Sequence, residues 1–216
     1  MAIQACIFDL DGVIVDSAKY HFESWKRLAD ELEINFTEAD NEKLKGVSRA
    51  DSLDRILTLG GKELSSDEKQ VLMDRKNEWY LEFIDRMEHD EILPGIRDFF
   101  EALRNAELKI ALGSSSKNAR RILNRLDLNK YFDAIVDGTD VSRSKPDPEV
   151  FNKGSEALNI APEFCVVVED SNAGIEAALK GGFQAIGINL DQNVHGIKIT
   201  LPDTRGLSLA LLEELN

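Results

Sequence analysis

The chain has 216 residues, of which 40 are Asp or Glu and 26 are Lys or Arg, so its formal net charge is -14 at pH 7. This charge argues against nucleic acid as a partner, because binding to a phosphate backbone depends on clustered Lys and Arg. No segment reaches the roughly 18 consecutive apolar residues of a membrane span, and no secretion signal is evident. We therefore expect a soluble, cytoplasmic protein that binds no membrane.

The first predicted element is a buried strand, Ile3–Phe8, which runs directly into the acids of the segment FDLDG. Further apolar runs predict strands at Lys109–Leu112, Ala134–Val136, Phe164–Val168 and Ala185–Ile188, with helical patterns between them. Strands that alternate with helices predict an α/β fold, here a Rossmann-like, doubly wound parallel sheet with helices on both faces. Ligands of such sheets bind beyond the carboxyl ends of the strands.

About ninety residues without a strand candidate separate the first predicted strand from the second, which is too long for a simple loop. Within them Ser48 is placed to cap a helix from Arg49 to Leu59, and Ser65 with Glu68 forms a capping-box pattern before a long amphipathic run. The predicted division is an α/β core of residues 1–16 and 88–216 with an inserted helical cap of residues 17–87.

Asp9 and Asp11 lie two residues apart at the end of the first strand, so both carboxylates can face one site while Leu10 turns away. Burying ionised carboxylates is costly unless a cation, hydrogen bonds or water compensates them. One carboxylate is suited to act as a nucleophile and the other as a general acid and base, which requires different surroundings. A solvated Asp-Gly turn is the alternative interpretation of these residues.

Ser114, Ser115, Ser116 and Lys117 follow the second core strand. Hydroxyls and backbone amides ahead of a helix N-terminus form an anion site, and a lysine adds positive charge. An ordinary N-cap would use only one of the three serines.

Lys145 lies in a proline-flanked loop further along the chain. Its neighbours Asp147 and Pro148 have a structural explanation, with Asp147 as the cap and Pro148 in the first turn of a helix. Lys145 itself is suited to contact a phosphoryl oxygen, whereas the more ordinary interpretation is an exposed loop lysine.

Glu169 and Asp170 follow another buried strand, and oxygen ligands at strand ends suit Mg²⁺. If this strand neighbours the first one, Asp9 and Asp170 can share the metal. The alternative role of Asp170 or Ser171 is to cap the helix that begins near Asn172. The cysteines, Cys6 and Cys165, lie in apolar runs and are predicted to be core thiols rather than a disulfide.

The four strand-end motifs, in this order, resemble those of the haloacid dehalogenase superfamily over essentially the whole chain. The resemblance implies a nucleophilic Asp9, an acid and base at Asp11, and phosphate contacts from Ser114 and Lys145. The implied Mg²⁺ ligands are Asp9, Asp11, Glu169 and Asp170. Sugar-phosphate phosphatases of the superfamily use the same acids, so these motifs leave transfer and hydrolysis open.

The segment LKGVSR at residues 44–49 distinguishes the cap. An arginine in the first turn of a helix is poorly placed for the helix dipole, and Arg49 could simply be solvated. With residues 20–22, 75–77 and 116–118, however, the segment is similar to sugar-phosphate mutases of the superfamily. That similarity implies that Arg49 and the loop Ser116-Lys117-Asn118 hold the phosphate that is not transferred.

The same similarity implies a monomeric enzyme that interconverts β-D-glucose 1-phosphate and D-glucose 6-phosphate. An aspartyl phosphate and β-glucose 1,6-bisphosphate would be its intermediates, and a sugar-phosphate phosphatase is the alternative. The residues implied to bind substrate are Ser17, His21, Trp25, Gly46, Val47, Ser48, Arg49, Ser52, Lys76, Ser114, Ser115, Ser116, Lys117, Asn118 and Lys145.

Overall fold

A parallel sheet forms the centre of the molecule, in a computed structural model that describes residues 2–190 and 196–215. Its order is β3-β2-β1-β4-β5-β6, and every pair is parallel. The strands are β1 (Ala5–Phe8), β2 (Lys109–Gly113), β3 (Ala134–Val136), β4 (Cys165–Glu169), β5 (Gln184–Ile188) and β6 (Ile199–Leu201). The predicted doubly wound sheet is confirmed. Sequence analysis missed β6, a short strand at the sheet edge.

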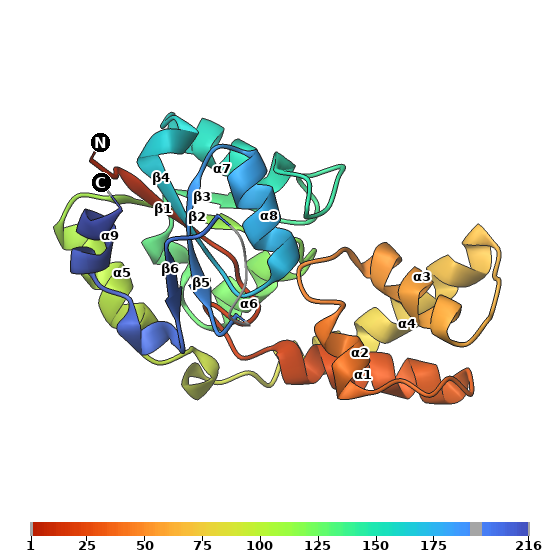
Figure 1. Ribbon diagram of the computed structural model, residues 1–216. Helices are drawn as coiled ribbons and strands as arrows, with labels where there is room; N and C mark the ends of the chain where they lie inside the picture. The colour runs from red at the N-terminus through yellow and green to blue at the C-terminus, as the bar shows by residue number, and fades with distance from the viewer. Residues whose placement is uncertain (1, 191–195, 216) are drawn as a thin grey trace.

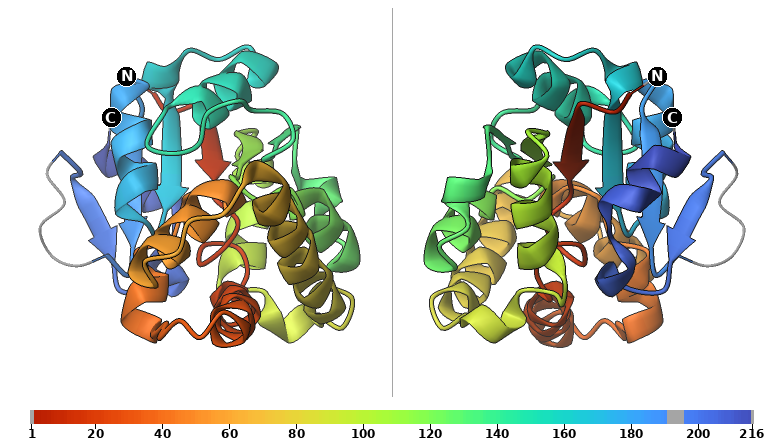
Figure 2. Two further views of the ribbon diagram at one scale, coloured as in Figure 1. Left: turned by 90° about the vertical axis from the view of Figure 1, so that its right-hand side faces the viewer. Right: turned by 90° about the vertical axis from the view of Figure 1, so that its left-hand side faces the viewer.

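Helices cover both faces of this sheet, because alternate side chains of each strand point in opposite directions (Figures 1 and 2). In β1, Cys6 and Phe8 belong to one apolar cluster, and Ala5 and Ile7 belong to another. The first cluster includes side chains of α5 (Ile96–Asn105), α6 (Ala119–Arg125) and α9 (Leu209–Glu214), and the second those of α7 (Glu149–Leu158) and α8 (Asn172–Lys180). Cys165 lies in the second cluster, so the two cysteines are buried free thiols, as predicted.

A group of helices between β1 and β2 lies beyond the end of the sheet (Figure 1). Its members are α1 (Ala18–Glu31), α2 (Glu38–Glu42), α3 (Arg49–Leu59) and α4 (Ser66–Ile84). They enclose an apolar cluster of their own that includes Trp25, Leu28, Leu53 and Ile56. We refer to these helices and their connections as the cap helices.

The chain leaves the sheet and returns to it along neighbouring paths. Val15, on the way out, forms an antiparallel bridge with Ile92, on the way back. Gly95 then takes the N-cap position of α5 with φ of 85°, a left-handed conformation that suits glycine. The short 3-10 helices are η1 (His89–Glu91), η2 (Asn129–Tyr131), η3 (Pro162–Phe164) and η4 (Thr204–Gly206).

Capping side chains set several helix starts, as the sequence predicts. The Ser48 hydroxyl accepts a hydrogen bond from the backbone NH of Asp51 at the start of α3, and Ser65 and Glu68 complete a capping box on α4. The prediction for α7 is wrong by one residue, because Pro148 is the N-cap rather than part of the first turn.

Two further caps bear on the functional site. The Asp147 carboxylate accepts from the backbone NH of Glu149 at 3.0 Å, beside Pro148. At the start of α8, the hydroxyl of Ser171 accepts from the backbone NH of Gly174 at 3.0 Å. Since Ser171 caps this helix, the carboxylate of Asp170 is left to face the carboxyl end of the sheet.

Candidate active site

A cavity of about 950 Å³ separates the carboxyl ends of β1, β2 and β4 from the cap helices. It lies where the strand order reverses direction, between β1 and β4, which is the usual ligand site of such sheets. The predicted residues that line it are Asp9, Asp11, His21, Trp25, Gly46, Val47, Ser48, Arg49, Ser52, Lys76, Ser114, Ser115, Ser116, Lys117, Asn118 and Asp170. Ser17, Lys145 and Glu169 do not line the cavity and are buried next to residues that do.

Asp9 and Glu169 lie side by side because β1 pairs with β4, with Phe8 opposite Val168. The ammonium group of Lys145 lies between the two acids and donates to Asp9 Oδ1 at 2.6 Å and to Glu169 Oε2 at 2.8 Å. The Lys145 side chain is fully buried, so the interpretation as an exposed loop lysine is wrong.

Glu169 uses its second carboxylate oxygen to organise the turn after β4. Oε1 accepts from the backbone NH groups of Asp170 and Ser171 at 3.1 and 2.9 Å and from the Ser171 hydroxyl at 2.8 Å. Both oxygens of Glu169 are therefore engaged within the protein, and its geometry is that of a residue that holds Lys145 in place.

The acids around Lys145 carry more negative charge than that lysine neutralises, so the site favours binding of a cation. Burial raises the pKa of Asp9, and the Lys145 ammonium opposes that rise. Burial, followed by the charges of Glu169 and Asp9, raises the pKa of Asp170 well above its ordinary value. Three buried carboxylates thus face the buried ammonium group of Lys145 and the more distant one of Lys45, which leaves an excess of negative charge.

The donor set of the cluster fits Mg²⁺. Asp9, Glu169 and Asp170 each offer a carboxylate oxygen within 4.8 Å of the others, and hard oxygen donors are what this ion prefers. Gly12 leaves room for the cluster: a Cβ at this position would lie 2.1 Å from Asp170 Oδ2, and its φ of +87° also favours glycine. This accounts for the glycine that ends FDLDG.

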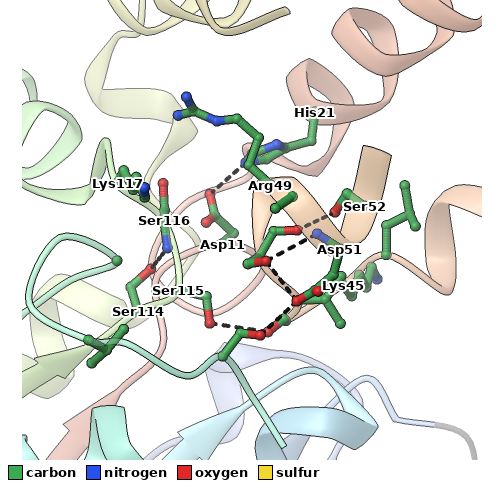
Figure 3. Close-up of a pocket in the computed structure, with 18 of the residues that line it drawn as sticks. Asp11, His21, Lys45, Arg49, Asp51, Ser52, Ser114, Ser115, Ser116 and Lys117 are labelled. Carbon is green, nitrogen blue, oxygen red and sulfur yellow. Dashed lines mark hydrogen bonds and ion pairs between the residues drawn. The ribbon is translucent and has the colours of Figure 1, made fainter. Parts of the chain in front are cut away.

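Asp11 has different surroundings, since its side chain is directed toward the cap helices. Its Oδ1 lies 3.7 Å from His21 Nε2 (Figure 3). The same oxygen accepts from the Ser17 hydroxyl and is 3.5 Å from the Tyr80 hydroxyl. Burial acts to raise the pKa of Asp11, but hydrogen bonds from His21 and Ser17 lower it overall. The side chain of Asp11 does not belong to the three-acid cluster.

His21 connects Asp11 to a buried lysine of the cap helices. Lys76 Nζ lies 3.0 Å from His21 Nδ1 and 4.6 Å from the ring centroids of Trp25 and Tyr80. Burial, and next the charge of Lys76, lowers the pKa of His21. With Lys76 donating to Nδ1, the proton of the neutral imidazole lies on Nε2, the atom that faces Asp11.

Arg49 and Asn118 come together through a residue outside the predicted set. Asn77 Oδ1 accepts from Arg49 Nη2 at 2.7 Å and from Asn118 Nδ2 at 2.8 Å, which links a cap helix to the loop after β2. Figure 3 shows Arg49 and His21 across from Ser116 and Lys117 of that loop. The only signal for Asn77 in the sequence is its place in residues 75–77, part of the resemblance.

The three serines after β2 make three different contacts. The Ser114 hydroxyl accepts from the backbone NH of Ser116 at 3.1 Å, and that of Ser116 accepts from the backbone NH of Asn118 at 3.2 Å. The hydroxyl of Ser115 instead donates to the carbonyl of Gly46 at 3.1 Å, across the cavity. The serine run therefore shapes a turn and contacts the cap helices.

Other residues of the segment 45–52 also reach the core or their own helix. Lys45 Nζ lies 3.7 Å from Asp170 Oδ2. Asp51 accepts from Ser144 of the core loop, a contact that sequence analysis did not foresee. The hydroxyl of Ser52 donates to the carbonyl of Ser48 at 2.9 Å, so in this structure it is engaged within α3.

A sheet with acids at the ends of β1 and β4, a buried lysine and a helical insert over the cavity is the architecture of a phosphoryl-transfer enzyme. Residues 6–188 match the haloacid dehalogenase-like hydrolase family, and the chain belongs to that family. It is 43% identical over 214 residues to the β-phosphoglucomutase of Bacillus subtilis strain 168, covering 98% of this chain and 95% of that protein.

Two further similar proteins show that this part of the family includes both mutases and phosphatases. The crystal structure of β-phosphoglucomutase from Clostridium difficile is similar with a TM-score of 0.94 and 38% identity, covering 99% of this chain and 96% of that one. A phosphorylated carbohydrates phosphatase of Thermotoga maritima is 34% identical over 208 residues, covering 95% of this chain and 90% of that protein. The similarity supports a phosphoglucomutase, an enzyme of the isomerase class.

Proposed function

We propose that this protein interconverts β-D-glucose 1-phosphate and D-glucose 6-phosphate, the β-phosphoglucomutase reaction. The observation that carries the proposal is the presence of two separate groups of cationic and polar side chains at or beside one cavity, each suited to bind a phosphate. Lys145, buried beside the cavity, and Ser114 lie near Asp9, whereas Arg49 of α3 and Lys117 and Asn118 of the loop after β2 lie toward the cap helices. A mutase that passes through a sugar bisphosphate needs both groups, because its intermediate carries two phosphates.

Asp9 is the proposed nucleophile. One of its oxygens attacks phosphorus as the bond from phosphorus to the sugar oxygen breaks, which yields an aspartyl phosphate. Lys145 stabilises the negative charge that develops on the phosphoryl oxygens, together with the hydroxyl of Ser114.

Asp11 is the proposed general acid and base. It gives its proton to the departing sugar oxygen and later takes one from the sugar hydroxyl that attacks the aspartyl phosphate. Ser17 and His21 hold its carboxylate in position for both steps. Attack by the sugar hydroxyl forms the bisphosphate, which then turns end for end before Asp9 attacks its other phosphate, so that each phosphate occupies each site in turn.

Mg²⁺ is the proposed cofactor, held by the carboxylates of Asp9 and Asp170 and the backbone carbonyl of Asp11, with Glu169 as a supporting acid. When bound, the ion neutralises charge on the transferring phosphoryl group.

The cap helices are proposed to exclude water from the phosphoenzyme. Engagement of the distal phosphate by Arg49 and the loop 116–118 draws the cap, residues 17–87, onto the core, with Gly46, Val47, Trp25 and Lys76 around the sugar. Binding energy from a remote group is thereby used to assemble the reacting geometry. We propose that the enzyme acts as a cytoplasmic monomer on small sugar phosphates and not on nucleic acid. Among the described residues, no helix is long and apolar enough to cross a membrane.

Phosphorus NMR distinguishes this function from hydrolysis, the second candidate, which the 34% identical phosphatase supports. Purified protein is incubated with β-glucose 1-phosphate, Mg²⁺ and a trace of β-glucose 1,6-bisphosphate. A mutase converts the substrate signal into that of glucose 6-phosphate with little inorganic phosphate. Accumulation of inorganic phosphate as the main product would instead establish a sugar-phosphate phosphatase.

A further inference from the structure

One contact between the cap helices and the core uses no residue of the proposed chemistry. Asp51 lies in the first turn of α3, two residues after Arg49, and its Oδ2 accepts from the hydroxyl of Ser144 at 2.8 Å (Figure 3). Ser144 lies in the core loop between β3 and α7, directly before Lys145. The contact thus joins the helix turn that carries Arg49 to the loop that carries Lys145.

The carboxylate of Asp51 is well suited to this contact. The same Oδ2 accepts from the Ser48 hydroxyl at 2.7 Å, and Ser48 in turn accepts from the backbone NH of Asp51. These bonds fix the side chain against its own helix, and hydrogen bonds from Ser48 and then Ser144 lower the pKa of Asp51, so it is ionised at neutral pH. Hydrogen bonds to an ionised acceptor are stronger than neutral ones.

The other polar contacts across the cavity have different properties. Those of Ser115 with Gly46 and of Lys45 with Asp170 involve residues of the phosphate loop or the acidic cluster. The ion pair of Arg121 with Asp85 also joins α6 to the end of α4, but both side chains are half exposed and neither lines the cavity.

We propose that Asp51 and Ser144 are positioning residues, whose hydrogen bond holds the Arg49 turn of α3 over the phosphoryl-transfer site. The inference rests on the proposed mutase function, because the role that we give to this contact is to keep the two phosphate sites of the mutase at the correct distance from each other. Neither residue touches the reacting atoms.

Ser144→Ala is the most direct test, because it removes the core hydroxyl and leaves Asp51 bonded to Ser48. We expect kcat/KM for β-glucose 1-phosphate to fall about tenfold, the low end for a hydrogen bond to a charged group. Phosphorylation of Asp9 by acetyl phosphate, which has no distal phosphate, should stay near the wild-type rate. Ser144→Thr keeps the hydroxyl and should restore most of the sugar reaction.

A matched control and a double variant test whether the two residues act together. Asp54→Asn removes a carboxylate from the same helix, but Asp54 pairs with Lys69 within the cap helices at 2.7 Å, so the sugar reaction should not change. Ser144→Ala added to Asp51→Ala should cause no further loss. If the losses of the two single variants add in the double variant, the proposal is overturned. An equal fall in the reaction of Ser144→Ala with acetyl phosphate would also overturn it, because that result would indicate that Lys145 is displaced.

Small-angle X-ray scattering of the substrate-free proteins gives a readout that does not depend on sugar turnover. The radius of gyration of Ser144→Ala should exceed that of the wild type and of Asp54→Asn, because the cap helices are less firmly held. Identical scattering curves would reject the Asp51–Ser144 contact as a restraint. If the wild type failed to convert β-glucose 1-phosphate while the scattering difference persisted, the proposed function would fail and the restraint would stand.

Discussion

The two sides of the cavity are held together in different ways. On the sheet side, Asp9 and Glu169 are buried at the ends of neighbouring strands, and Lys145 of the core loop contacts them at 2.6 and 2.8 Å. On the cap side, Arg49 is half-buried and reaches Asn118 of the core only through Asn77. The comparison teaches that the groups proposed for phosphoryl transfer are held within the core alone, whereas the groups proposed to recognise the second phosphate depend on two layers meeting.

Asp9→Asn should have the largest effect, because it affects the sheet side directly. It removes the oxygen that attacks phosphorus and one carboxylate of the acidic cluster, so mutase and phosphatase turnover should both disappear. Turnover assays and acetyl phosphate labelling measure the loss, and circular dichroism checks that the fold persists. Retention of even about a tenth of wild-type turnover would contradict the assignment of Asp9 as nucleophile.

Asp11→Asn should have the next largest effect, because Asp11 follows β1 closely in the chain and its side chain faces the cap helices. Loss of the acid and base should slow transfer by roughly 10²–10⁴. Mg²⁺ affinity, measured by calorimetry, should remain close to wild type. Asp170→Ala is the comparison, since it removes a carboxylate of the metal cluster. Equal losses of metal affinity would mean that the Asp11 side chain binds the ion.

Arg49→Ala should affect only the cap side. Loss of a charge-assisted contact to the distal phosphate should reduce the sugar reaction by about ten- to a hundredfold, while acetyl phosphate reactivity is nearly unchanged. Arg55→Ala provides a matched control, because Arg55 lies on the same helix and donates to the carbonyl of Lys43. Equal losses in both reactions, or none in either, would remove the distinction between the two sides and favour a simple phosphatase.

Ser65→Ala should have the smallest effect on catalysis. It breaks the capping box of α4, far along the chain from the acids, and should lower the free energy of unfolding by about 0.5–2 kcal/mol. Urea denaturation measures this change, and Ser65→Thr should restore the cap. The sugar reaction at saturating substrate should stay at the wild-type rate. A loss as large as that of Arg49→Ala would show that the cap side is sensitive to helix stability alone.

Local patterns in the sequence were sufficient to predict much of the fold. Apolar runs marked the inner strands because these strands are buried on both faces, and Ser48 and Ser65 marked helix starts because a cap is a contact with the next few residues. By contrast, β6 has only three residues with partly exposed side chains, so its pattern is too short to read. The short helix α2 was missed for the same reason.

The sequence by itself also determined which chemical groups stand at the strand ends, including Asp9, Asp11 and Asp170. It did not determine which of them meet. The pairing of β1 with β4 brings Asp9 to Glu169 and Asp170, and packing of the core loop buries Lys145 between two acids. Asp9 and Lys145, for example, are neighbours in space although they are 136 residues apart in the chain.

The cap side shows this limit most clearly. No local pattern reveals the core partners of Asn77 and Asp51 or the cap partner of Ser144, because each of these contacts forms where a cap helix meets a core loop. Periodicity, helix capping and the residue types at strand ends depend on residues close together in the chain, so these features could be predicted from the sequence alone. The partners of these polar groups are set by how distant elements pack, which only the tertiary structure decided.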